Sequence, residues 1–396
     1  MFRAIASFVV AFVAALPSSA AEPVRQDLFT AGEGGYAMYR IPGLVVTAKG
    51  TLLVYCEARK KGSDWGEIDL LVRRSTDGGK TFSEPRPIGQ RPIDAQRNPA
   101  AVARKQGTDG AITMNNPVMI AGNAGEVHLL YCIEYGRCFY ARSDNDGQTF
   151  GPSSEITAAF DKLKHEYGWK VLAIGPGHGI ELSTGRLLAP VWLSLGTEGN
   201  AHRPSRVTTV YSDDNGKTWT AGQIMTAHKD PVLGNPSETN AVELSDGRVM
   251  LNIRNDGPRK LRAVTISPDG ATDWSNIVFD PALPEPVCFA SLHRYSGGKG
   301  SNGKNIILFS NPNNPTDRKR QNLTVKVSED DGKTWPISKI LEPGLSAYSD
   351  LAVGADGKIY CFFERGVDGK AYARLTLAAF DLEWLRQARS TVRNTR

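Results

Sequence analysis

The chain has 396 residues, with 47 Lys and Arg against 42 Asp and Glu, which gives a formal net charge of +5 at pH 7. With 40% hydrophobic and 22% charged residues, its composition is that of a globular protein and excludes a disordered chain. Its 40 Gly and 23 Pro have no three-residue period, which excludes a collagen-like fibre, and the weak positive charge argues against nucleic-acid binding. So many glycines are typical of short strands joined by tight turns.

The first residues have the pattern of an export signal. Arg3 precedes an apolar run over residues 4–16, which is too short to span a membrane. Pro17 and the small residues 18–21 follow, as at a signal-peptidase site. We therefore expect a signal peptide over residues 1–21 and export of the mature chain, to a periplasm or out of the cell, with no membrane span. Residues 22–396 are expected to form one domain.

An eight-residue motif recurs after short alternating strands. It begins with Ser, continues through Asp and Gly, and ends in Thr followed by Phe or Trp. Copies begin at Ser75, Ser143, Ser212 and Ser328, and a decayed copy begins at Ser267. Asp can bond to turn backbone and Gly can adopt positive φ, so each copy predicts a turn between strands. We assign the turn carboxylates as Asp77, Asp146, Asp214, Asp269 and Asp330.

The spacing of the motif predicts the architecture. Successive copies begin 68, 69, 55 and 61 residues apart (143 − 75, 212 − 143, 267 − 212 and 328 − 267). That length suits one four-stranded propeller blade with its loops. About 370 mature residues at roughly 60 per repeat predict six blades. We therefore expect an all-β fold, a six-bladed β-propeller over residues 22–396.

The cysteines do not predict a disulfide framework. An odd number, five, is sparse for an exported domain. Cys132 and Cys138 are close enough in sequence to bridge, but Cys56, Cys132 and Cys361 lie in apolar strand-like runs. We favour the interpretation that they are small buried hydrophobic residues.

Three arginines from different repeats are candidate ligands for an anion. Arg40 opens an Arg-Ile-Pro-Gly segment, Arg254 ends the strand-like run 249–254, and Arg320 lies at the entry to the strand before the last motif. Only a closed ring could bring the three together. Such a cluster would hold an anion, and a planar carboxylate matches the guanidinium fork. Taken singly, each is more often a solvated surface residue.

The octet resembles the Asp-box of sialidases, and other segments make the resemblance specific. They are Arg40-Ile-Pro, residues 237–255 with Glu238 and Arg254, Arg320-Gln-Asn-Leu-Thr-Val, residues 347–351 around Tyr348, Phe363-Glu364-Arg365, and residues 175–182 and 380–385. They appear in family order over essentially the whole mature chain. The chain thus resembles a bacterial exo-α-sialidase (neuraminidase) of the Asp-box, or BNR, propeller family.

This resemblance implies a site for a sugar that carries its own carboxylate. Arg40, Arg254 and Arg320 would bind that carboxylate, and Tyr348 would be the nucleophile. A neutral phenol avoids the repulsion that a carboxylate nucleophile would meet, and tyrosine is the known exception among retaining glycosidases. A phenol of pKa about 10 needs a base at neutral pH, which the resemblance places on Glu238. Glu243 is the alternative to Glu238, and Arg318 the alternative to Arg320.

The remaining roles follow from the same resemblance. Asp64, on a loop rich in Gly and Ser, would protonate the leaving group and then act as base on water. Arg59 would support the pocket floor, and Glu364 would ion-pair with Arg40. Candidates for an acetamido pocket, unranked, are Trp169, Trp192, His178 and Arg203.

We therefore expect an exo-α-sialidase that releases terminal sialic acids with retention, through a tyrosyl-enzyme intermediate. Its partners would be sialylated glycans of glycoproteins and glycolipids. No metal or organic cofactor is predicted, since the six His form no ligand cluster, and we expect a monomer. The alternatives are a trans-sialidase, intermolecular or forming an anhydro-sugar, and a non-catalytic Asp-box propeller that binds glycans.

Overall fold

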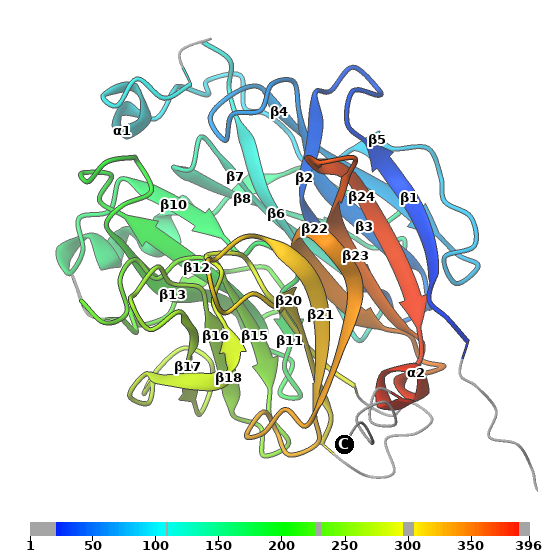
Figure 1. Ribbon diagram of the computed structural model, residues 1–396. Helices are drawn as coiled ribbons and strands as arrows, with labels where there is room; N and C mark the ends of the chain where they lie inside the picture. The colour runs from blue at the N-terminus through cyan, green and yellow to red at the C-terminus, as the bar shows by residue number, and fades with distance from the viewer. Residues whose placement is uncertain (1–20, 108–109, 227–230, 296–304, 388–396) are drawn as a thin grey trace, which may run out of the picture.

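The computed structural model describes residues 21–107, 110–226, 231–295 and 305–387. Within these ranges nearly all regular structure is β-strand, which confirms the all-β prediction (Figure 1). The helices there are short: α1 (Pro99–Val102), a 3-10 helix η1 (Thr157–His165) and α2 (Leu382–Arg386). None of them has the length and apolar character that crossing a membrane requires. The signal peptide predicted over residues 1–21 lies, apart from Ala21, outside the described residues.

Four of the sheets are built from strands that follow one another in the chain. The first contains β2 (Met38–Val46), β3 (Leu52–Arg59), β4 (Ile68–Ser75) and β5 (Arg86–Pro87). The second contains β6 (Met114–Ala121), β7 (Val127–Ile133), β8 (Arg137–Ser143) and β9 (Ser154–Glu155). The third contains β10 (Val171–Ile174), β11 (Ile180–Glu181), β12 (Leu187–Ser194), β13 (Ser205–Ser212) and β14 (Thr220–Ala221). The fourth contains β15 (Thr239–Glu243), β16 (Val249–Ile253), β17 (Leu261–Ser267) and β18 (Val278–Pro284).

The remaining strands join in one larger sheet through a shared strand. In spatial order they are β1 (Val24–Thr30), β24 (Lys370–Phe380), β23 (Ile359–Val367), β22 (Ile337–Val353), β21 (Gln321–Ser328), β20 (Ile307–Pro312) and β19 (Ser291–Arg294). The first half of β22 pairs with β21, and its second half, from Ser346 onward, pairs with β23. Strand β1 pairs antiparallel with β24, so the two ends of the described chain complete the same sheet.

The sheets contact one another in a closed series. β2 contacts β6, β6 contacts β10, β12 contacts β15, β15 contacts β19, and β22 returns to β2. Asp350 of β22 ties several of these strands together, because its Oδ2 accepts from the Leu44 N–H at 2.9 Å and its Oδ1 lies 2.7 Å from His178 Nδ1 and 2.8 Å from Ser291 Oγ. His178 is therefore part of the packing between sheets.

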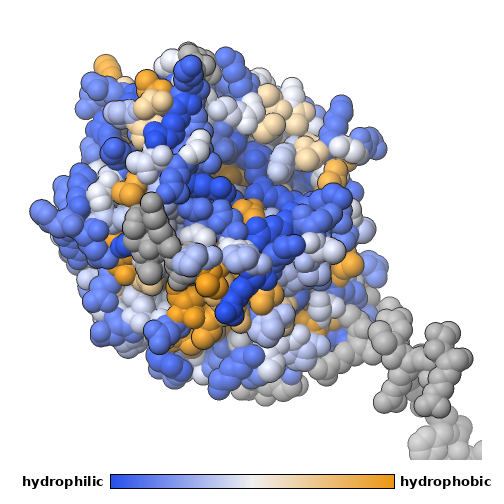
Figure 2. Space-filling view, turned by 60° about the vertical axis from the view of Figure 1, so that its left-hand side comes forward, coloured by the Kyte–Doolittle hydropathy of each residue, from blue (hydrophilic) through white to orange (hydrophobic). Residues whose placement is uncertain are grey.

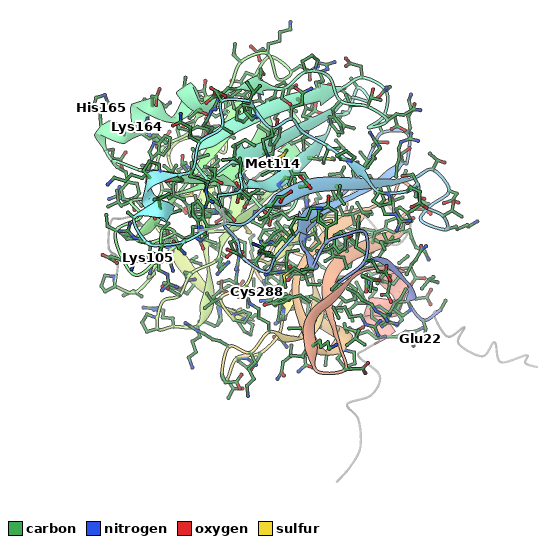
Figure 3. All side chains as sticks on the ribbon, turned by 90° about the horizontal axis from the view of Figure 1, so that it is seen from above. Glu22, Lys105, Met114, Lys164, His165 and Cys288 are labelled. Carbon is green, nitrogen blue, oxygen red and sulfur yellow. The ribbon has the colours of Figure 1, made fainter. Side chains whose placement is uncertain are left out.

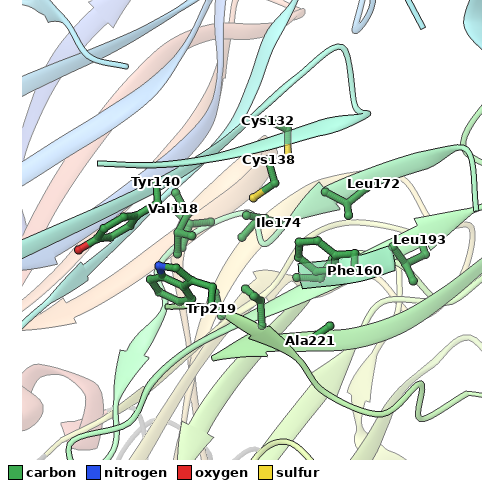
Figure 4. Packing of buried hydrophobic residues seen from close by; sticks show 14 of the residues in the cluster. Val118, Cys132, Cys138, Tyr140, Phe160, Leu172, Ile174, Leu193, Trp219 and Ala221 are labelled. Atoms are coloured by element: carbon green, nitrogen blue, oxygen red, sulfur yellow. The ribbon is translucent and has the colours of Figure 1, made fainter. Parts of the chain in front are cut away.

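Hydrophobic residues fill the spaces between neighbouring sheets. Figure 4 shows one such layer, in which Val118 of β6, Ile174 of β10 and Trp219, just before β14, pack together. Burying a side chain of this kind stabilises the fold by about 1.5–3 kcal/mol. Trp169 belongs to the same layer, where its Nε1 donates to the Phe160 carbonyl at 3.2 Å. By contrast, the face in Figure 2 is mostly hydrophilic, with hydrophobic residues in separate groups.

The recurring motif forms compact turns in which one side chain holds the backbone. In the first copy Asp77 Oδ1 accepts from the Ser75 hydroxyl and from the Lys80 and Thr81 N–H groups, and Oδ2 accepts from the Thr81 hydroxyl. Asp214, Asp269 and Asp330 accept in the same way within their own copies.

The second copy departs from the prediction. There Asn145, not Asp146, takes the turn position, accepting from Ser143 Oγ at 2.9 Å and the Thr149 N–H at 2.8 Å. The turn requires an oxygen two residues after the serine, and that residue is Asn145. Asp146 instead accepts from Thr51 Oγ1 at 2.6 Å and pairs with Arg74, so it links this turn to the preceding sheet.

All five cysteines are buried and carry free thiols, which confirms their interpretation as small hydrophobic residues. Cys132 and Cys138 lie directly opposite each other on β7 and β8.

Candidate active site

Three of the strands that meet at the centre of the ring each carry a β-bulge. In β2 the register shifts between Arg40 and Gly43, in β6 between Asn115 and Val118, and in β22 between Ser346 and Ser349. In each bulge two residues oppose a single residue of the partner strand, which re-aims side chains. Two of the bulged residues precede Pro and have left-handed φ, 58° at Ile41 and 52° at Asn116. The third bulge contains Tyr348.

Gly43 follows the first bulge and cannot be replaced without a clash. A Cβ at this position would lie 2.0 Å from the Tyr55 ring. The Tyr55 hydroxyl in turn donates to the Gly177 carbonyl at 3.0 Å. The Arg-Ile-Pro-Gly segment therefore combines the bulge that directs Arg40 with a close approach of backbone to ring.

The bulges open onto a cavity of about 150 Å³. It is lined by Arg40, Ile41, Arg59, Asp64, Asn116, Tyr135, Trp192, His202, Glu238, Arg254, Arg320 and Tyr348. The structure thus brings together the three predicted catalytic residues and the four predicted arginines. A second cavity of about 120 Å³ shares Trp192, His202, Glu238 and Arg254 with the first and adds Arg203, which pairs with Asp256 at 2.9 Å.

Tyr348 and Glu238 are in direct contact in the cavity. The Tyr348 hydroxyl lies 2.6 Å and 2.7 Å from the two carboxylate oxygens of Glu238, and Arg254 Nη1 donates to the hydroxyl at 2.7 Å. Arg254 also pairs with Glu238. Burial raises the pKa of Tyr348 well above its usual value; the Glu238 charge raises it further, while Arg254 and Arg320 oppose the shift. The phenol is therefore neutral at neutral pH and has a carboxylate in place to receive its proton.

Glu364 lies behind Arg40 and fixes its guanidinium. Arg40 Nε donates to Glu364 Oε1 at 2.5 Å and Nη2 donates to Oε2 at 3.3 Å. The same carboxylate accepts from the N–H groups of Ile41 and Tyr348, each at 3.1 Å. One buried side chain therefore orients both the first arginine and the backbone of the tyrosine. Cys288, labelled in Figure 3, packs with Ile41, Phe289, Ala347 and Tyr348.

The structure separates the alternative residues that the sequence left open. Arg320 lines the cavity, with its Cζ 5.2 Å from the centre of the Tyr348 ring, whereas Arg318 Nη1 donates to the Asp256 carbonyl at 3.2 Å. Glu243 lies at the far end of β15 from Glu238. There it accepts from the Ser183 hydroxyl at 2.6 Å and has no contact with Tyr348.

Asp64 occupies the exposed side of the cavity. Its side chain is 52% exposed, and its Oδ1 lies 2.5 Å from Nη1 of Arg59, which is 1% exposed. Arg59 is held from behind by Glu57 Oε2, at 2.6 Å from Nη2 and 3.0 Å from Nε, and Glu57 Oε1 accepts from the Asn116 N–H at 2.8 Å. Desolvation raises the pKa of Asp64, but the charges of Arg59, His202 and Arg40 outweigh it and lower that pKa to about 2.

The cavity also contains residues that the sequence reasoning missed. The Tyr135 and His202 rings are tilted against each other by 49° with their centres 4.8 Å apart. The His202 ring centre lies 5.1 Å from that of Trp192, the one acetamido candidate that lines the first cavity. The buried Trp192 Nε1 and His202 Nε2 have no hydrogen-bond partner among the described residues. The sequence could have identified Asn116 as a candidate, because Asn116-Pro117 inside an apolar strand run repeats the pattern of Ile41-Pro42. No sequence pattern marks Tyr135 and His202, since their neighbours in the cavity come from other sheets.

Comparisons with known proteins agree with this geometry. Residues 94–361 match the family model of the BNR repeat-like domain. A sialidase of Micromonospora viridifaciens is 33% identical to this chain, and the match covers 91% of this chain and 54% of that sialidase. A sialidase of Bacteroides fragilis (strain YCH46) is also 33% identical, and the match covers 77% of this chain and 55% of that sialidase. The chain thus spans about half the length of these two curated relatives. The solved structure of Hadza microbial sialidase Hz136 is 28% identical with a TM-score of 0.73, covering 90% of this chain and 68% of that one. The chain belongs to the BNR repeat-like family, in which the proteins that it resembles are sialidases.

Proposed function

We propose that this protein is an exo-α-sialidase that hydrolyses terminal sialic acids of glycoconjugates. The observation that supports the proposal is the cluster of Tyr348, Glu238 and Arg254, in a cavity that is also lined by Arg40, Arg59 and Arg320. A phenol in contact with a carboxylate base suits a substrate whose reacting carbon is next to a negative charge. A binding module would have no use for that contact.

In this proposal Arg40, Arg254 and Arg320 bind the sugar carboxylate and Tyr348 attacks the anomeric carbon as Glu238 takes its proton. Arg254 stabilises the negative charge that develops on the phenol oxygen. The glycosyl-tyrosine that forms is then hydrolysed, so that the released sugar keeps its anomeric configuration. Trp192 and His202, with their unpartnered nitrogens, are the proposed wall of the acetamido pocket.

Asp64 is the proposed acid in the first step and base in the second. In the empty site Asp64 is ionised, because neighbouring positive charges hold its pKa at about 2. A substrate carboxylate bound by the arginines offsets those charges, and the pKa of Asp64 then rises. Binding of the correct substrate would thereby bring the proton donor to its working protonation state.

We further propose that the sheets form six blades. The shared strand β22 divides the largest sheet into two four-stranded sets, which together with the other four sheets would make six. The export of the mature domain, residues 22–396, belongs to the same proposal.

The first experiment measures release of 4-methylumbelliferone from its sialic-acid glycoside by wild type and Tyr348→Phe. We expect release by wild type and a loss of several orders of magnitude in the variant, which should still bind free sialic acid. NMR of the product should show the α-anomer first. An anhydro-sugar, or transfer to an added acceptor, would instead indicate a trans-sialidase. No release by a folded, glycan-binding wild type would indicate a non-catalytic propeller.

A further inference from the structure

Tyr372 of β24 lies between two of the arginines of the cavity, although no sequence motif marks it. The Arg40 Cζ lies 3.9 Å from the centre of the Tyr372 ring, at cation–π distance. Arg320 Nη1 lies 3.3 Å from the Tyr372 hydroxyl. One side chain thus contacts two guanidinium groups that come from β2 and from the residue before β21.

The backbone at Tyr372 is distorted in a way that directs this side chain. Between the pairs Arg365–Arg374 and Val367–Lys370 the β23–β24 register shifts, so that residues 371–373 oppose only Gly366. Tyr372 itself has a left-handed φ of 57°. An aromatic residue rarely adopts this conformation, which persists only where surrounding contacts maintain it. Bulges near active sites typically re-aim a side chain in this way.

The chemistry of the contact suits two like charges that must remain free to bind an anion. Glu364 already neutralises Arg40 from behind, whereas the hydrogen bonds of Arg320 go to two uncharged acceptors, the Val287 carbonyl at 2.6 Å and the Tyr372 hydroxyl. A carboxylate in place of Tyr372 would orient both arginines but would compete with the substrate for them. A phenol provides a π face and a neutral acceptor, which orient the guanidiniums and leave their charge available.

We propose that Tyr372 is a positioning residue that sets the separation of Arg40 and Arg320 for the substrate carboxylate. The inference rests on the proposed function and adds a determinant of carboxylate recognition to it. Its effect should appear in binding of the carboxylate and not in the chemical step, because Tyr372 does not line the cavity.

Two variants separate the contributions of the ring and the hydroxyl. Tyr372→Phe retains the stack on Arg40 and removes the acceptor for Arg320. Tyr372→Gly removes both, and because Gly adopts positive φ freely it relieves the backbone instead of straining it. The matched control is Tyr360→Phe, which removes a hydroxyl with a bond of the same length, 3.3 Å to the Gly78 carbonyl, outside the cavity.

The experiment measures KM, kcat and the Ki of free N-acetylneuraminic acid and of its methyl ester, which lacks the carboxylate charge. For Tyr372→Phe we expect KM and the Ki of the acid to rise about three-fold, and for Tyr372→Gly about ten-fold or more. We expect kcat to stay within about two-fold. Because the ester cannot use the paired arginines, its Ki should not change, and neither should any value for Tyr360→Phe.

Unchanged KM and Ki in both folded variants would overturn the proposal. An equal rise in the Ki of the acid and the Ki of the ester would also overturn it. A wild type that releases no sialic acid would refute the proposed function alone. Calorimetric titration with the acid and the ester would then still compare wild type with the variants. If the acid did not bind to wild type, the inference about Tyr372 would fail with the function.

Discussion

The Asp-box turns and the central cavity both depend on carboxylates, but the hydrogen-bond partners of these carboxylates are close in sequence in the turns and distant in sequence in the cavity. Every hydrogen-bond partner of Asp77 lies within four residues of it in the chain. Glu364 bonds to Arg40 and Ile41, which are 324 and 323 residues away, and Glu238 bonds to Tyr348 across 110 residues. A turn can therefore form wherever its octet occurs, whereas the cavity exists only once the ring of sheets has closed.

The same contrast appears in the pKa values. Hydrogen bonds from the side chain and the N–H of Thr218 lower the pKa of the box residue Asp214 to about 2. The pKa of Asp64 is also lowered to about 2, but there desolvation acts in the opposite sense and the charges of Arg59, His202 and Arg40 overcome it. Backbone bonds in a turn do not change when a ligand binds, while the charges around Asp64 do. The pKa of Asp64 is therefore the one that a substrate can shift.

The largest effect is expected from Glu238→Gln, which removes the base and leaves a side chain of the same shape. We expect kcat/KM for the methylumbelliferyl substrate to fall about 10²–10⁴-fold, because the phenol loses its proton acceptor. Glu243→Gln, at the end of β15 that is far from Glu238 and bonded to Ser183, is the matched control and should retain activity. Equal losses in the two variants would contradict the assignment of Glu238.

A selective effect is expected from Asp64→Asn. Methylumbelliferone is a good leaving group that needs little protonation, so its release should fall much less than hydrolysis of 3′-sialyllactose, whose leaving alcohol needs an acid. A pKa of about 2 means that free wild type loses protonated Asp64 as pH rises. Above the optimum, kcat/KM for sialyllactose should therefore decrease by up to about ten-fold per pH unit, and this slope should vanish in the variant. The same loss on both substrates at all pH values would exclude Asp64 as the acid.

The smallest effect is expected in the turns, from Asp269→Asn. The folded pKa of Asp269 is about 2 against a reference of 3.8, so its ionised form stabilises the fold at pH above about 3.8, and this contribution is lost as pH falls toward 2. Melting curves between pH 5 and 2 should show a smaller decrease in Tm for the variant than for wild type. Its kcat/KM at neutral pH should stay within about two-fold. A large loss of activity would mean that this turn and the cavity are coupled.

The sequence by itself determined the features that are built within a few residues or carried by a family motif. The repeated octet predicted an all-β fold, and the motifs located every predicted arginine and catalytic residue that now lines the cavity. Apolar strand-like runs likewise indicated that Cys56, Cys132 and Cys361 are buried.

The tertiary structure alone decided which of several residues that are close in sequence lines the cavity. It placed Arg320 and not Arg318 on the cavity, whereas the place of Asn145 in its turn follows from its spacing of two residues after Ser143. It also brought in Tyr135, His202 and Tyr372, whose partners come from distant strands. The physical reason is that one extra residue in a bulge reverses which side chains of a strand face the centre, and the alternating pattern of the sequence does not show where such a bulge lies. Contacts across the ring depend on those bulges, so they follow from closure of the whole fold.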